Sequence, residues 1–323
     1  MDQYGTSVPS EYESVPEAPI RRITVADVAH MSYTDPVIII DAHAIEFHRF
    51  PLDPECIVPF ILDDFRDELV PVATQGDIHL SEWVNRRPKG YLKDWKVNDS
   101  AEKRGIARLF KTPPFFSDWL NDFYLNTHEG QLDFQFLYWG EEGSNTGYHE
   151  DVAGTFSWSF NLRGQKEWKF YMHRSDERWI ISAIQKPGEL VFVPSGCYHT
   201  VRNLERDTIS INQNWLNEYN LVEVCERILQ DSLESKRRFE MFDIKFDTLE
   251  EEIHKIDSLV GINNDLNVEL ILKIIEYRIS SGPFQANTGK KINAAITVLR
   301  KTPQNAIFER EISCIEQSVE FNR

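Results

Sequence analysis

Short segments of alternating apolar and polar residues fill the middle of the sequence, between about residues 133 and 215. In 155–162 (TFSWSFNL) and 208–215 (TISINQNW), small polar and large apolar side chains alternate with the period of two expected of a half-buried strand. Gly and Pro residues separate these segments, as in Arg163-Gly164-Gln165 and Pro187-Gly188. The pattern predicts a mainly β protein with added α structure, whose core is a double-stranded β-helix of the jelly-roll or cupin kind.

The segments on either side of this core have other periods. Residues 36–40 form a β-branched run typical of a buried strand, 23–31 suggest a short helix, and a helix is expected to start at 115–120, after Pro113-Pro114. Elements within 45–125 are otherwise not assigned. After residue 220 the apolar residues recur at helical spacing, in 221–229, 249–260, 270–279 and 290–300.

Four regions are therefore predicted. They are a flexible lead-in (1–20), an N-terminal mixed α/β region packing on the barrel (21–132), the jelly-roll core (133–220) and a C-terminal helical region (221–323). Each C-terminal helix has one apolar stripe that must be buried. We expect these helices to pack on the barrel, and homodimerisation through them is the alternative.

The charge of the chain limits its partners. With 52 acidic and 35 basic residues the net charge is −17, which disfavours direct binding of nucleic acid and is compatible with a basic protein partner. Solubility alone is also a sufficient reason for such a charge. No apolar run approaches the roughly 20 residues of a membrane span, and the polar N-terminus does not resemble a secretory signal. Four scattered cysteines without a C-x-x-C pair favour a reducing compartment, the cytoplasm and also the nucleus.

A candidate metal site lies in the segment Gly147-Tyr-His-Glu-Asp151. On a strand, residues i and i+2 point to the same face, so His149 and Asp151 are predicted to reach one ion. His199, just past the strand of 188–196, would complete the set. Two histidines and one carboxylate leave three positions open on Fe(II), enough for a bidentate cosubstrate and O2. Either histidine alone is more readily interpreted as a hydrogen-bonded core residue, and the combination favours the metal.

A lysine near the metal site could hold an anion. Lys166 follows the turn 163–165, and a lysine facing into the barrel there would need an anionic ligand to offset its burial. Lys169 is equally placed by spacing alone, so the residues themselves do not decide between the two.

Two segments resemble the JmjC oxygenases, and the resemblance is close over residues 134–220. They are WGEEGSNTGYHEDVAGTFSWSFNLRGQKEWKFY and KPGELVFVPSGCYHTVRNLERDTISINQNW, with FSWS, GELVFVPSG-x-x-H and TISIN-x-NW as the most specific phrases. The resemblance implies that His149, Asp151 and His199 bind iron and that Lys166 pairs with the distal carboxylate of 2-oxoglutarate. Three further positions match the cosubstrate pocket of the family, although Ser159 stands where relatives have Asn: Thr146, Ser159 and Asn212.

The resemblance also implies a reaction. Within the family, the sequence is most similar to the subgroup that hydroxylates a lysine of the translation termination factor. The expected activity is protein hydroxylation, in which 2-oxoglutarate and O2 give succinate and CO2 and a C–H bond becomes C–OH. No Cys-rich zinc finger or other chromatin-reading module is recognisable, which favours a hydroxylase.

Three alternatives to the hydroxylase remain open. One is an N-methyl-lysine demethylase, which uses the same reaction on an N-methyl group. Another is a non-catalytic, cupin-like metal-binding module, which the presence of both Asp151 and Lys166 disfavours. The third is a cupin-type isomerase or dioxygenase, which needs no lysine to pair with an anion.

Overall fold

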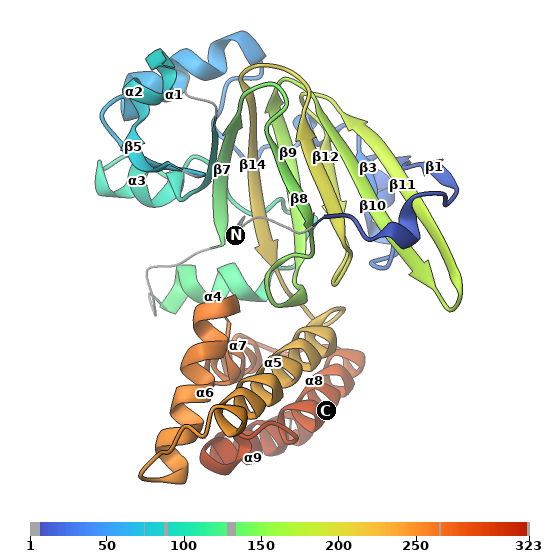
Figure 1. Cartoon of the computed structure of the whole chain (residues 1–323), viewed down its shortest axis with the longest axis vertical. Helices are drawn as coiled ribbons and strands as arrows, with labels where there is room; N and C mark the ends of the chain where they lie inside the picture. Colours follow the sequence, from blue (N-terminus) through green and yellow to red (C-terminus); the bar gives the residue numbers. More distant parts are fainter. Residues whose placement is uncertain (1–6, 74, 87–89, 128–133, 265, 322–323) are drawn as a thin grey trace. The chain divides into compact units, whose positions relative to one another are not determined.

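The computed structural model describes residues 7–73, 75–86, 90–127, 134–264 and 266–321, so the first six residues of the expected lead-in lie outside it. The chain forms two compact units. The first comprises Met1–Phe116, Asp133–Asp151 and Phe156–Asn214, and the second comprises Ser117–Leu132, Val152–Thr155 and Trp215–Arg323. Figure 1 shows the strands in the first unit and the long C-terminal helices in the second. The four-region division of the sequence stays a prediction.

Within the described residues, the first unit contains two sheets. The smaller has five strands in the order β1 (Glu17–Pro19), β11 (Glu177–Gln185), β10 (Lys166–Arg174), β13 (His199–Asn203) and β8 (Asn145–His149). The larger has nine, in the order β2 (Arg21–Ile23), β3 (Val37–Ile39), β12 (Leu190–Val193), β9 (Phe156–Arg163), β14 (Thr208–Trp215), β7 (Gln135–Gly140), β6 (Tyr91–Trp95), β4 (Leu69–Val72) and β5 (Gly76–His79).

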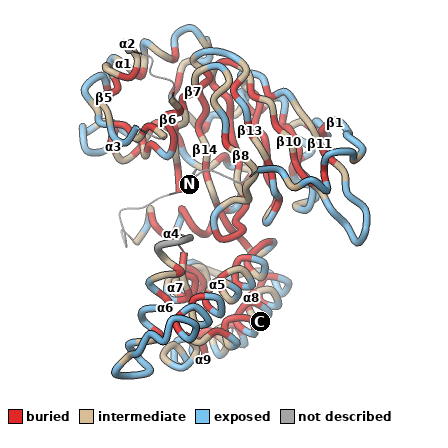
Figure 2. Tube along the Cα trace, in the orientation of Figure 1, coloured by how far each residue is buried: buried red, intermediate tan, exposed pale blue. Residues whose placement is uncertain are grey.

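The chain from β7 to β14 passes back and forth between the two sheets. Strands β7, β9, β12 and β14 belong to the larger sheet, and β8, β10, β11 and β13 to the smaller. This is the double-stranded β-helix that the alternating segments predict, so the fold expectation is confirmed. The turn between β9 and β10 needs glycine, because Gly164 has φ 71° and a Cβ there would lie 2.4 Å from the Thr208 hydroxyl. Figure 2 shows buried residues along β7 and β14, whereas the turn joining β10 and β11 is exposed.

The N-terminal segment extends the larger sheet. Strands β2 and β3 add to one end of it, and β6, β4 and β5 add to the other. The β-branched run predicted at 36–40 is strand β3, which is fully buried, and the helix expected at 23–31 is a short 3-10 helix, η2 (Val25–His30). The other helical elements of this segment are η1 (Ser10–Tyr12), η3 (Ala42–Ala44), η4 (Pro54–Cys56), α1 (Ile57–Phe65), α2 (Leu80–Arg86) and α3 (Val97–Lys103).

The second unit is helical. Its elements are α4 (Trp119–Thr127), the turn η5 (Val152–Gly154), α5 (Leu221–Met241), α6 (Leu249–Asn264), α7 (Val268–Ser280), α8 (Ala286–Leu299) and α9 (Asn305–Phe321). The predicted C-terminal helices are confirmed, and α9 was not predicted. Within the unit, α5 packs against α6 and α8, and α9 against α7 and α8. Packing of these helices on the barrel or on a second copy stays a prediction.

Helices α4 and α6 begin where the sequence predicted them, within 115–120 and at 249. Helix α4 begins at Trp119 because the Asp118 carboxylate accepts hydrogen bonds from the backbone N–H groups of Leu120 and Asn121 and so caps it. At α6, the Thr248 hydroxyl accepts a hydrogen bond from the Glu251 N–H, as a capping box requires, but the Glu251 carboxylate bonds to the N–H of Asp247 instead of Thr248. None of the helices in the described part of the chain is both long and apolar enough to span a membrane.

Candidate metal centre

Two histidines lie side by side on neighbouring strands of the smaller sheet. His149 ends β8 and His199 begins β13, the two residues are direct partners in the ladder, and their ring centroids are 4.2 Å apart. His149 Nδ1 lies 2.8 Å from the Gly147 carbonyl oxygen, and His199 Nδ1 lies 2.9 Å from that of Cys197. A carbonyl can only accept, so both Nδ1 atoms carry the proton. Both Nε2 atoms therefore keep a lone pair for a metal ion.

Asp151 completes the cluster from a loop. The prediction that His149 and Asp151 share one strand was wrong, because β8 ends at His149. The chain turns soon afterwards, where Ala153 and Gly154 both have positive φ, and this turn leads into β9. The Ser157 hydroxyl donates a 2.7 Å hydrogen bond to Asp151 Oδ2 and orients the carboxylate. Ligand atoms of Asp151, His149 and His199 all lie within 4.8 Å of one another.

Burial prepares this cluster for a cation. Burial, followed by the neighbouring His199, lowers the pKa of His149 to about 4, so its imidazole is neutral near pH 7. Two imidazoles and one carboxylate form the donor set that suits a non-haem Fe(II) with open coordination positions. The residues present therefore fit such an ion.

A buried ammonium lies in the same pocket. Lys166 begins β10 with a 1% exposed side chain, and its amine donates to the Ser210 hydroxyl. No carboxylate among the described residues forms an ion pair with it. Burial, and secondarily Lys93, lowers its pKa to about 7. Lys169, three residues further along β10, is partly exposed on the other face, where its amine lies 3.8 Å from a Glu17 carboxylate oxygen.

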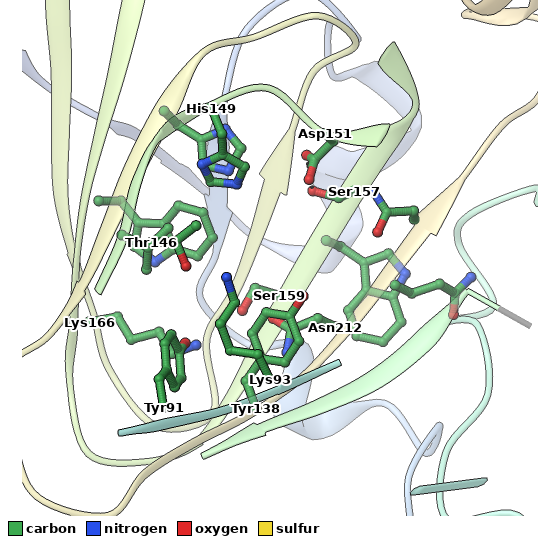
Figure 3. Close-up of a pocket in the computed structure, with 16 residues that line it drawn as sticks. Tyr91, Lys93, Tyr138, Thr146, His149, Asp151, Ser157, Ser159, Lys166 and Asn212 are labelled. Atoms are coloured by element: carbon green, nitrogen blue, oxygen red, sulfur yellow. Dashed lines mark hydrogen bonds between the residues drawn. The ribbon is translucent and has the colours of Figure 1, made fainter. Parts of the chain in front are cut away.

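The other three residues of the expected cosubstrate pocket also line this cavity (Figure 3). Thr146 is buried on β8, three residues before His149. Asn212, on β14, donates from Nδ2 to the Ser210 hydroxyl at 3.0 Å, so it belongs to the network around Lys166. Ser159 is 2% exposed, and no described residue forms a hydrogen bond with its hydroxyl. That hydroxyl is free to contact a ligand.

Sequence reasoning missed several residues of the pocket. Lys93, on β6, is 4% exposed, and burial lowers its pKa to about 8. Its amine lies 5.6 Å from the ring centroids of both Tyr91 and Tyr138. Ser210, the hydrogen-bond partner of Lys166, was missed too, although it had a usable signal, because it shares a strand face with Asn212 at spacing i, i+2. Lys93 had a weaker one, a lysine between apolar neighbours in the segment Tyr91-Leu-Lys-Asp-Trp95.

Comparison with known proteins gives a consistent result. Residues 174–215 match the family model described as "JmjC domain, hydroxylase", a span that includes His199, Ser210 and Asn212. The "2-oxoglutarate and iron-dependent oxygenase JMJD4" of Danio rerio is 35% identical over 260 residues, which cover 69% of this chain and 60% of that protein. The protein of the same name from Mus musculus is 35% identical over 174 residues, 44% of this chain and 40% of that protein.

A plant relative has a different name. The "Arginine-specific demethylase JMJ20" of Arabidopsis thaliana is 35% identical over 207 residues, covering 50% of this chain and 44% of that protein. The chain thus spans 60% of the length of the zebrafish relative and less than half of the other two.

Proposed function

We propose that this chain, which belongs to the JmjC-domain family, is an iron(II)- and 2-oxoglutarate-dependent oxygenase acting on a protein. One observation supports this most directly. Two imidazoles with accessible Nε2 lone pairs and one carboxylate lie within 4.8 Å of one another, and the pocket beside them contains a buried lysine. A metal and an organic anion together match this combination, and the relatives' names state both iron and 2-oxoglutarate.

Each residue has a proposed role. His149, Asp151 and His199 would hold the iron, and Ser157 would keep one carboxylate oxygen of Asp151 hydrogen-bonded while the other faces the ion. Lys166 would pair with the distal carboxylate of 2-oxoglutarate, an interaction that restores the charged state of a buried amine. The supporting polar contacts to the same ligand would come from Thr146, Ser159 and Asn212.

Iron and 2-oxoglutarate would supply the oxidising chemistry, in which O2 and 2-oxoglutarate give succinate and CO2 while a substrate C–H bond becomes C–OH. The chain contributes geometry and exclusion of water. Trp168 stacks on the His199 ring with centroids 5.7 Å apart, Phe170 lies 5.9 Å from the same ring, and His199 is 3% exposed, so these aromatic rings help to exclude water from it. Burial also raises the pKa of Tyr138, which therefore stays protonated and donates to Asp94 at 2.7 Å.

The finer proposal is lysyl hydroxylation of a translation termination factor. It is supported by the resemblance of the sequence to that JmjC subgroup and by the net charge of −17, which suits a basic protein substrate. N-methyl demethylation is the second candidate, because one relative is named an arginine-specific demethylase.

Succinate formation and substrate mass test these proposals together. The protein is incubated with Fe(II), 2-oxoglutarate and O2, with and without the termination factor, and succinate is measured by NMR. We expect succinate to increase with substrate and the substrate to gain one oxygen atom, whereas demethylation of a methylated peptide would remove one CH2 unit. Asp151→Ala is the inactive control. Metal binding without succinate would instead support a non-catalytic cupin-like module.

A further inference from the structure

A second lysine, Lys93, occupies the pocket without a role in the function proposed above. It lies on β6, outside the jelly-roll strands, and its side chain is 4% exposed. In Figure 3 the amine points from the side of Tyr91 and Tyr138 toward the part of the pocket where His149 lies. His149 and Lys166 line the same pocket, and the charge of Lys93 contributes to lowering the pKa of each.

The backbone at Lys93 is distorted. The register of β6 against β7 shifts between Leu92 and Trp95, and Asp94 has φ 58°, in the left-handed region that Asp adopts more often than most residues other than glycine. Such bulges occur next to active sites, where they redirect a side chain. Here the exposed Asp94 accepts a hydrogen bond from the Tyr138 hydroxyl, while Lys93 remains inside between the Tyr91 and Tyr138 rings. The bulge therefore places the Lys93 amine in the pocket that also contains the metal cluster, where a ligand can reach it.

The charges of the pocket indicate which ligand group Lys93 meets. A divalent ion held by Asp151 would repel an ammonium on the same side of the cavity, unless an anion lies between them. A 2-oxo acid places its first carboxylate beside the metal. The distal carboxylate is already matched by Lys166, so the metal-proximal carboxylate is the anion available to Lys93.

We propose that Lys93 binds the metal-proximal carboxylate of a 2-oxo acid, while Lys166 binds the distal one. This proposal rests on the proposed function and defines the ligand class more closely. The ligand would be a 2-oxo dicarboxylic acid, and the pocket would offer a buried ammonium to each of its two carboxylates. The two rings beside Lys93 stabilise its charge when no ligand is bound, through cation–π attraction.

Binding of two ligands by three lysine variants tests the assignment. The protein is loaded with Mn(II), so that no turnover occurs, and titrated calorimetrically with 2-oxoglutarate. Binding of 2-oxovalerate, which lacks the distal carboxylate, is measured by its competition with 2-oxoglutarate. The variants are Lys93→Met, Lys166→Met and Lys169→Met, the last as a control on a partly exposed lysine. Methionine keeps the length of the side chain and removes its charge.

We expect Lys93→Met to weaken both ligands by the same factor, about thirtyfold or more. Lys166→Met should weaken 2-oxoglutarate and leave 2-oxovalerate unchanged, and Lys169→Met should alter neither. The proposal is overturned if Lys93→Met behaves like Lys169→Met, or if it weakens 2-oxoglutarate alone, since Lys93 would then lie at the distal end. Wild-type protein that binds no 2-oxoglutarate would contradict the proposed function itself, which is a different result.

Folding of the variants is checked by thermal unfolding without ligand. Lys93→Met should unfold in a single cooperative transition, which shows that the variant is folded. Should it fail to fold, Lys93→Gln replaces it in the same titrations, with the same expected loss for both ligands.

Discussion

The two compact units bury charged groups in different ways. In the helical unit, Asp118 and Asp257 are buried, and backbone N–H groups at helix starts bond to both, those of Leu120 and Asn121 for the first and that of Val268 for the second. In the sheet unit, the Lys166 amine donates a hydrogen bond to the Ser210 hydroxyl and lies 5.9 Å from the Tyr138 ring centroid, and no carboxylate among the described residues pairs with it. The two buried carboxylates of the helical unit are therefore stabilised by hydrogen bonds from the chain itself. We infer that a buried charge without a counter-ion in the chain, such as that of Lys166, is paired with a charge on a ligand.

The difference predicts opposite responses to pH. Asp257 has a raised pKa, so the folded state binds more protons than the unfolded state between about 3.8 and 6, and its contribution to stability falls as pH rises through that window. Lys166 has a lowered pKa, so the unfolded state binds more protons between about 7 and 10.5, and ligand-free stability rises with pH there. Substitutions in the sheet unit should change binding, and substitutions in the helical unit should change stability.

The largest effect on activity is expected from Asp151→Ala, which should abolish turnover. Losing the only carboxylate of the cluster should weaken metal binding by at least about a hundredfold and abolish succinate production, because altering even an outer partner of a ligand costs about 10–100-fold. Metal affinity is measured by calorimetry with Mn(II), and turnover by NMR. Glu150→Ala is the matched control, one residue away and outside the cluster. Unchanged metal affinity in Asp151→Ala would show that this carboxylate is not a ligand.

Removal of the buried ammonium should give the next largest effect. Lys166→Met is expected to weaken 2-oxoglutarate by about 3–5 kcal/mol, the cost of leaving one partner of a buried ion pair alone. Without ligand the same variant should be at least as stable as the wild type at pH 7, and stability should no longer rise between pH 7 and 10.5 on account of this group. Binding is followed by calorimetry and stability by chemical denaturation. A variant that lost stability without losing affinity would remove the distinction between the two units.

Asp257 tests the helical side of the comparison. Burial raises the pKa of this carboxyl to about 6, although it accepts hydrogen bonds from Val268 N–H and Gln304 through Oδ1. Asp257→Asn keeps that oxygen and removes the charge, so it should raise the free energy of unfolding above pH 6 by about 1–3 kcal/mol. The gain should disappear near pH 4, where both side chains are neutral. Denaturation at several pH values measures it, and affinity for 2-oxoglutarate should not change.

At the metal cluster, the sequence predicted which side chains lie close together better than it predicted the secondary structure that holds them. The spacing of His149 and Asp151 led to the right pair of side chains through the wrong element, because the turn at Ala153 and Gly154 that ends the strand early has no signature in an H-x-D pattern. The choice of Lys166 over Lys169 needed a resemblance, since spacing alone left both open. Burial separates them clearly, because residues three apart on β10 lie on opposite faces.

Other features depended on long-range pairing that a sequence does not show. Lys93 enters the pocket because β6 pairs with β7, more than 40 residues later in the chain, and a register shift at Asp94 has no local code. The jelly roll was predictable because some of its strands, such as β9 and β14, alternate apolar and polar residues, whereas β11 was not predicted. Helix α9 was not predicted, because among its residues of described burial only Ile312, Ile315 and Val319 are buried, between polar and small residues.

The smallest effect is expected from Ser159, where the comparison depends on one hydroxyl. This group is buried, and no described residue bonds to it, whereas buried hydroxyls in the helical unit do have partners, as Ser232 donates to the Ile228 carbonyl at 2.7 Å. If the Ser159 hydroxyl contacts 2-oxoglutarate, Ser159→Ala should weaken binding by about 0.5–1.5 kcal/mol, the usual net value of one hydrogen bond. The ligand-free protein should become slightly more stable, since an unsatisfied polar atom has been removed from the interior. Ser232→Ala, the control, should lower stability and leave affinity unchanged. Equal 2-oxoglutarate affinity in wild type and Ser159→Ala would mean that this hydroxyl faces the pocket without serving the ligand, and an unmatched buried group would then not be a guide to the site.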